Sequence, residues 1–130
     1  MTTELINDYI SEKTLLGSIG KNHRYIQTLL KEKANIIKKV QLVMDEKART
    51  KTPLNDKQQR MFQNFTGAYA KEGGKLKESL MRMEHIQNDL HSNKTQPFIL
   101  ALVLLQKHQI NAINSLRRMI ASGKKALSIL

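Results

Sequence analysis

The chain has 130 residues and carries 22 Lys and Arg residues against 11 Asp and Glu residues, which gives a formal charge of +11 at pH 7. This length corresponds to about one domain and excludes a multidomain enzyme. With 2 prolines, 6 glycines and 5% aromatic residues, the composition lacks the turn and strand residues of an all-β sandwich and favours helices. Cysteine is absent, which excludes disulfides and thiolate zinc sites.

The chain shows no targeting pattern and no membrane-spanning pattern. Its first residues lack the basic region and apolar core of a secretory signal peptide. The longest apolar run, from Phe98 to Leu105, is too short to cross a bilayer. We therefore expect a cytoplasmic protein without a membrane partner.

A first helix is predicted over about residues 3–16, because its apolar residues recur at helical spacing on one side. Gly17 and Gly20 follow this segment. Glycine favours helix ends and lowers stability inside helices, so we expect the first helix to end here.

A second helix is predicted over residues 22–49. Ile26 and Leu29 begin a stripe of apolar residues in the alternation of three and four that is typical of coiled coils. A second stripe runs beside it at sevenfold spacing, which favours packing against more than one neighbour. Lys47 and Arg49 complement the dipole at the predicted carboxyl end.

A third helix is predicted over residues 55–91. Asn55 and Gln58 have the spacing of a capping box, although Thr52-Pro53 offers a competing start. The pair Gly73-Gly74 lies in the middle of the segment and costs about 2 kcal/mol relative to two alanines. A kink or break is therefore an open alternative there. The apolar stripe repeats every seven residues at Phe62, Tyr69, Leu76, Met83 and Leu90.

A fourth helix is predicted over residues 97–121, with Pro97 in its first turn and Gly123 as its carboxyl cap. Its opening residues are apolar on every side, which is typical of a centrally buried helix. Short connections between the predicted helices favour antiparallel neighbours.

The predicted fold is a single all-α domain over residues 1–130, an antiparallel helical bundle of about four helices. Residues 22–49 and 55–91 are expected to form a long central coiled-coil-like hairpin, along which the last helix packs. The predicted core consists of Ile26, Leu29, Ile36, Val40, Phe62, Leu76, Leu102, Leu105 and Leu116.

Motifs that carry chemistry are few. The run from Gly17 to Lys21 resembles the end of a phosphate-binding loop, but Leu15 stands in place of the first glycine. His85 and Asp89 have the i, i+4 spacing of a metal-ligand or base pair, yet spacing fixes no third ligand and such pairs are mostly solvated. We therefore predict no catalytic residue, no metal site and no cofactor, and a protein that is not an enzyme.

Positive charge is concentrated towards the carboxyl end, because no acidic residue follows Asp89. A cationic strip of this kind can contact the phosphates of a nucleic acid, although lysines also serve solubility. The candidate polyanion-binding residues are Lys38, Lys39, Arg117, Arg118, Lys124 and Lys125.

Two functional hypotheses follow. The apolar stripes favour a non-catalytic helical interaction or adaptor protein of a macromolecular assembly, which binds a partner protein or its own copy through coiled-coil-like contacts. The alternative is a basic accessory protein that contacts nucleic-acid phosphates with little sequence readout.

Overall fold

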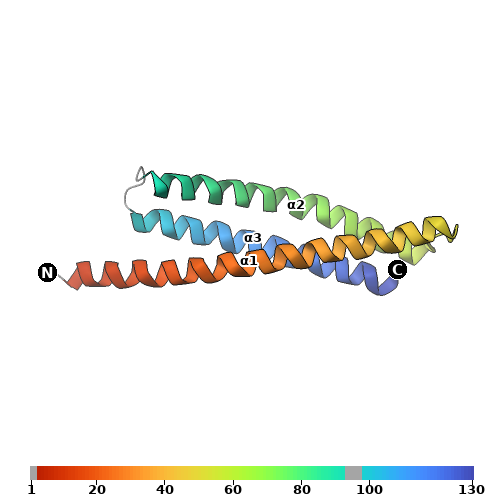
Figure 1. Cartoon of the computed structure of the whole chain (residues 1–130), viewed down its shortest axis with the longest axis horizontal. Helices are drawn as coiled ribbons and strands as arrows, with labels where there is room; N and C mark the ends of the chain where they lie inside the picture. Colours follow the sequence, from red (N-terminus) through yellow and green to blue (C-terminus); the bar gives the residue numbers. More distant parts are fainter. Residues whose placement is uncertain (1–2, 93–97) are drawn as a thin grey trace.

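The computed structural model describes the backbone of residues 3–92 and 98–130, and the side chains from residue 12 onwards within these ranges. This part of the chain forms α1 (Thr3–Arg49), α2 (Asp56–His91) and α3 (Phe98–Ile129). α1 and α3 run in the same direction and α2 runs in the opposite direction (Figure 1). The all-α prediction is confirmed, but the expected count of about four helices is wrong.

α1 continues through both glycines at which the sequence predicts a break. Neither Gly17 nor Gly20 has the positive φ of a helix-ending glycine. The two residues between them form hydrogen bonds with α3. Ser18 Oγ accepts one from Gln106 at 2.8 Å, and the Ile19 carbonyl accepts one from Gln109 at 3.1 Å. These contacts offset the propensity cost of glycine, about 1 kcal/mol each. The side chains of the predicted apolar face over residues 3–11 lie outside the described residues.

α2 begins at the predicted capping box. The backbone N–H of Gln58 donates to Asn55 Oδ1 at 2.8 Å, and the backbone N–H of Asn55 donates to Gln58 Oε1 at 3.0 Å. The same Gln58 side chain donates to the Ile129 carbonyl at 3.0 Å, which ties the start of α2 to the end of α3. The helix is continuous through Gly73-Gly74, so the possible break is not observed.

α3 extends past Gly123 to Ile129, instead of ending near residue 121. Its predicted start at Pro97 lies outside the described residues. Gly123 is not a cap: it is buried where the three helices meet, and a Cβ atom there would overlap Ile36 Cγ2 and lie 3.3 Å from Phe65 Cε2. Because glycine has no side chain, α1 and α2 can both approach α3 closely at the position of Gly123.

α3 is the central helix of the described fold, since it packs against both α1 and α2. No Cα atoms of the described parts of α1 and α2 come within 8 Å of each other. Their side chains, among them Leu30 and Leu80, instead border a groove of about 310 Å³. The expected direct hairpin of residues 22–49 and 55–91 is thus not confirmed, and each of the two helices packs on α3.

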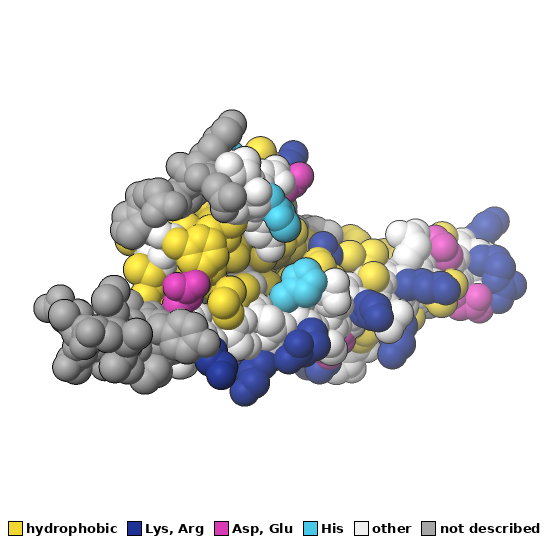
Figure 2. All heavy atoms as spheres, turned by 60° about the vertical axis from the view of Figure 1, so that its left-hand side comes forward, with side chains coloured by type: hydrophobic (Ala, Val, Ile, Leu, Met, Phe, Trp, Pro, Cys, Tyr) yellow, Lys and Arg dark blue, Asp and Glu magenta, His cyan; other side chains and the backbone are white. Residues whose placement is uncertain are grey.

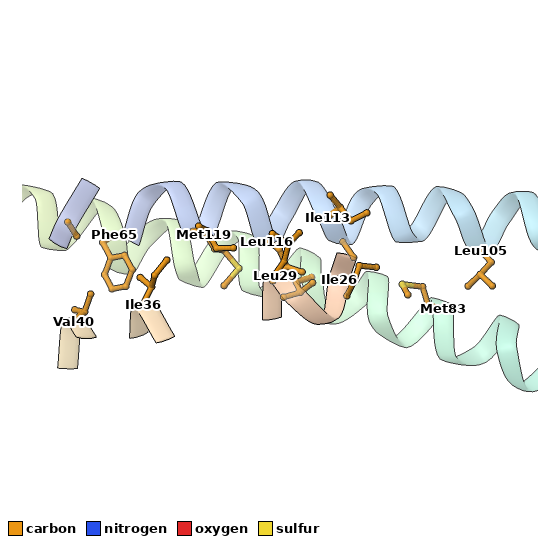
Figure 3. Packing of buried hydrophobic residues seen from close by; sticks show 14 residues of the cluster. Ile26, Leu29, Ile36, Val40, Phe65, Met83, Leu105, Ile113, Leu116 and Met119 are labelled. Atoms are coloured by element: carbon orange, nitrogen blue, oxygen red, sulfur yellow. The ribbon is translucent and has the colours of Figure 1, made fainter. Parts of the chain in front are cut away.

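The core is one row of side chains between the helices (Figure 3). The predicted core residues are buried, except Phe62, which is partly buried against the same cluster. α3 contributes the largest share, including Leu102 and Leu116. It also contributes Gln109, which is fully buried and bonded to α1.

Candidate functional site

The six candidate polyanion-binding residues do not lie on one surface. Arg117 and Lys124 line a groove between α1 and α3, whereas Arg118 lines the groove between α2 and α3. Adjacent residues of a helix point about 100° apart, so a pair of consecutive cations is divided between two faces. Lys38 and Lys39 are exposed on α1, and Lys125 is exposed near the end of α3.

Two of these cations form ion pairs between helices. Lys124 Nζ lies 2.9 Å from Glu32 Oε1, which joins α3 to α1. Arg118 Nη1 lies 3.5 Å from Glu72 Oε2, and the Glu72 side chain is only 8% exposed. A buried carboxylate requires a compensating charge, so Arg118 has a structural role in holding α3 on α2.

The groove between α2 and α3 is polar and positively charged. It has a volume of about 320 Å³. Donors from both helices face it, and Glu78 is the acidic side chain among its described lining residues. We call it the basic groove. Its nitrogen donors are Lys75 and Arg82 of α2, with His108, Asn111, Asn114 and Arg118 of α3.

His108 is the titratable imidazole that lines this groove. Burial and the charges of Arg82 and Lys107 lower the pKa of His108 below its ordinary value of 6.5, against the opposing effect of Glu78. The imidazole is therefore neutral at pH 7. A neutral imidazole can still donate one ring N–H to a ligand.

An apolar surface adjoins the basic groove on the outward face of α3. Leu104 and Met81 border a shallow depression of about 790 Å³ that also includes His108. Leu100 is 53% exposed and Met81 is 60% exposed. On the face drawn in Figure 2, hydrophobic side chains gather beside the grey atoms, whereas Lys and Arg lie mainly along the lower edge and at the right-hand end. We call the following set the apolar patch: Met81 of α2, with Leu100, Val103, Leu104 and Ile110 of α3.

The apolar opening of α3 has a buried inner side and an exposed outer side, and the outer side belongs to the apolar patch. Its inner residues, such as Leu102 and Leu105, are buried as predicted, but its outer residues face solvent. The prediction of a helix buried all round is therefore wrong. The sequence shows that the opening of α3 is apolar on every side, but only the placement of α1 and α2 shows which side is uncovered.

The remaining candidate pair, His85 and Asp89, lies on the surface. His85 Nε2 lies 3.5 Å from Asp89 Oδ2, with the His85 side chain 79% exposed. Among the described residues, no three His, Cys, Asp or Glu side chains are grouped as a metal site would require. The described helices also lack a stretch long and apolar enough to cross a membrane.

Comparison with protein-family models, with curated proteins and with solved structures finds no match to this chain.

Proposed function

We propose that this protein is a non-catalytic helical interaction protein that binds a partner protein through the apolar patch. The observation that carries the proposal is the exposure of Leu100, Val103 and Leu104 together on the outward face of α3. Contiguous apolar side chains of this size are costly in water and mark interaction surfaces. A helix of the partner, laid along α3, would bury them.

The charge of α3 indicates the chemistry of that partner. α3 carries Lys107, Arg117 and Lys125, in addition to Arg118 and Lys124, which pair with Glu72 and Glu32, and it contains no acidic residue. Two copies of this chain packed α3 against α3 would bring like charges together, which disfavours a homodimer at this face. A partner helix with one apolar face and acidic flanks complements both the patch and the charge.

Photo-crosslinking in cells that naturally contain the protein tests this proposal. Benzoylphenylalanine at Val103 should give a discrete crosslinked product, while the same group at exposed Gln63 should give none. The crosslinked protein should then bind the purified wild-type chain directly. Crosslinking to a second copy would reassign the patch to self-association, and equal products from both positions would contradict the proposal.

The second candidate function is that of a nucleic-acid-binding accessory protein, and the basic groove is the observation that favours it. Lys and Arg side chains that contact phosphates release counterions, so binding by this route weakens steeply with salt. Oligonucleotide affinity measured at several salt concentrations tests this candidate. We propose the cytoplasm as the location for either function, because the cysteine-free composition suits a reducing compartment.

A further inference from the structure

The basic groove brings cations of two helices together. The six polyanion-binding residues predicted from the sequence, in contrast, lie on separate surfaces. Lys75 and Arg82 lie on one wall and Arg118 on the other, with the amides of Asn111 and Asn114 beside it. We propose that the phosphate groups of a nucleic-acid backbone bind in the basic groove between α2 and α3. This inference rests on the second candidate function and assigns it a site.

The charges of the groove are only partly neutralised by the protein. Lys75 Nζ lies 3.9 Å from Glu72 Oε1, and Arg118 approaches the same carboxylate at 3.5 Å, so both contacts are long. Arg82 donates through Nε and Nη2 to one oxygen of Glu78, at 3.2 and 2.9 Å. Three cations thus share two carboxylates, and a positive charge remains for an anionic ligand.

The shape of the groove fits a polymer backbone. Lys75 and Arg82 are separated by two helical turns, or about 10 Å along α2. Two cations at this separation can contact more than one phosphate of the same strand. The amides of Asn111 and Asn114 add neutral donors on the facing helix, which is the usual complement of side chains at phosphates.

Among the described residues that line the groove there is no Phe, Tyr or Trp side chain on which bases could stack. The aromatic rings of Phe62, Phe65 and Tyr69 pack with one another along α2 and against the core instead. Single-strand binders that hold bases use exposed aromatic side chains for this purpose. We therefore expect contacts to phosphates, with little sequence preference.

Two charge-matched double variants test the site. Lys75→Gln/Arg82→Gln removes two cations from the groove, and Lys38→Gln/Lys39→Gln removes two exposed cations from α1. The groove variant leaves the Arg118 pair with buried Glu72 in place, so it should fold. Equal melting temperatures of both variants and the wild type confirm this before binding is compared.

Fluorescence anisotropy of short duplex and single-stranded oligonucleotides at several salt concentrations provides the comparison. The wild type should bind, and the groove variant should lose about tenfold or more in affinity at low salt, with its log–log salt slope reduced by about two. The α1 variant should lose clearly less. Equal losses in both variants would overturn the groove as the site while the candidate function stands. No binding by the wild type would overturn both.

His108 provides an independent readout by NMR. It faces Glu78 and Arg82 of α2 and neighbours Lys107 on its own helix. A phosphate bound in the groove adds negative charge beside the imidazole, so the pKa of His108 should rise when saturating oligonucleotide is added. An unchanged pKa of His108 in a saturated complex would place the phosphates elsewhere and overturn the inference.

Discussion

Gln109 of α3 donates a hydrogen bond from Nε2 to the backbone carbonyl of Ile19 in α1, at 3.1 Å. Its Oε1 accepts a hydrogen bond from Asn22 Nδ2 at 3.3 Å, so both ends of this fully buried amide bind α1. A polar group with both partners present fixes the register of two packed helices more narrowly than apolar contacts do. This contact lies beside the glycines that α1 passes through.

Replacement of Gln109 by alanine should lower the free energy of unfolding by about 2–5 kcal/mol, because it removes both hydrogen bonds and leaves a cavity. Urea denaturation measures the change. The matched variant Gln106→Ala loses one partly buried hydrogen bond to Ser18 and should cost only about 1 kcal/mol. Similar costs for the two variants would show that Gln109 does not anchor α1.

Gly123 and Gly74 should respond to alanine in opposite directions. At position 123 a Cβ atom would overlap Ile36, so Gly123→Ala should destabilise the fold by about 1–3 kcal/mol through overpacking. At position 74 a Cβ would meet nothing within 4 Å, so Gly74→Ala should stabilise α2 by about 1 kcal/mol. Melting temperatures that rise for both variants would refute the close approach at Gly123.

Lys51 has φ of 55° at the end of α1, a conformation that favours glycine. The N–H of Thr52 donates to the Lys47 carbonyl at 2.9 Å, and the N–H of Lys51 donates to the Ala48 carbonyl at 3.2 Å, as in a Schellman motif. Lys51→Gly should therefore stabilise the protein by about 1 kcal/mol in chemical denaturation. Destabilisation would show that another conformation is preferred here.

Tyr69 has a buried hydroxyl that makes no hydrogen bond in the described part of the chain. Removal of an unsatisfied group relieves its desolvation cost, so Tyr69→Phe should raise the free energy of unfolding by about 1 kcal/mol. Burial also raises the pKa of Tyr69 above 10.0. Wild-type stability should therefore fall above pH 10, where the unfolded phenol ionises first, and the advantage of Tyr69→Phe should widen. A variant that is less stable at every pH would contradict this.

Features set by local sequence could be predicted. The capping box of Asn55 and Gln58 involves residues three apart, so its geometry needs no tertiary information. Buried Ile36 lies on the predicted stripe with the alternation of three and four, and buried Leu76 lies on the stripe of the next helix that repeats every seven residues.

Features set by helix arrangement could not be predicted. Gly17 and Gly20 favour a break locally, whereas α1 is continuous where Ser18 and Ile19 accept hydrogen bonds from α3 and Ile19 packs against the core. The basic groove depends on which sides of two helices face each other, so Lys75 and Arg82 were not among the candidates from sequence. The apolar patch likewise depends on which side of α3 the other helices leave uncovered.

The affinity of the crosslinked partner for two matched leucine variants tests the central claim most directly. Leu100→Gln/Leu104→Gln alters the apolar patch, and Leu16→Gln/Leu42→Gln alters two other exposed leucines. Burial of one leucine contributes about 1.5–3 kcal/mol and about 1.4 kcal/mol is tenfold in affinity, so calorimetry should show at least about a tenfold loss for the patch variant. The control variant should bind as the wild type does, with all melting temperatures alike. Unchanged affinity of the patch variant, or equal losses in both, would contradict binding through the outward face of α3.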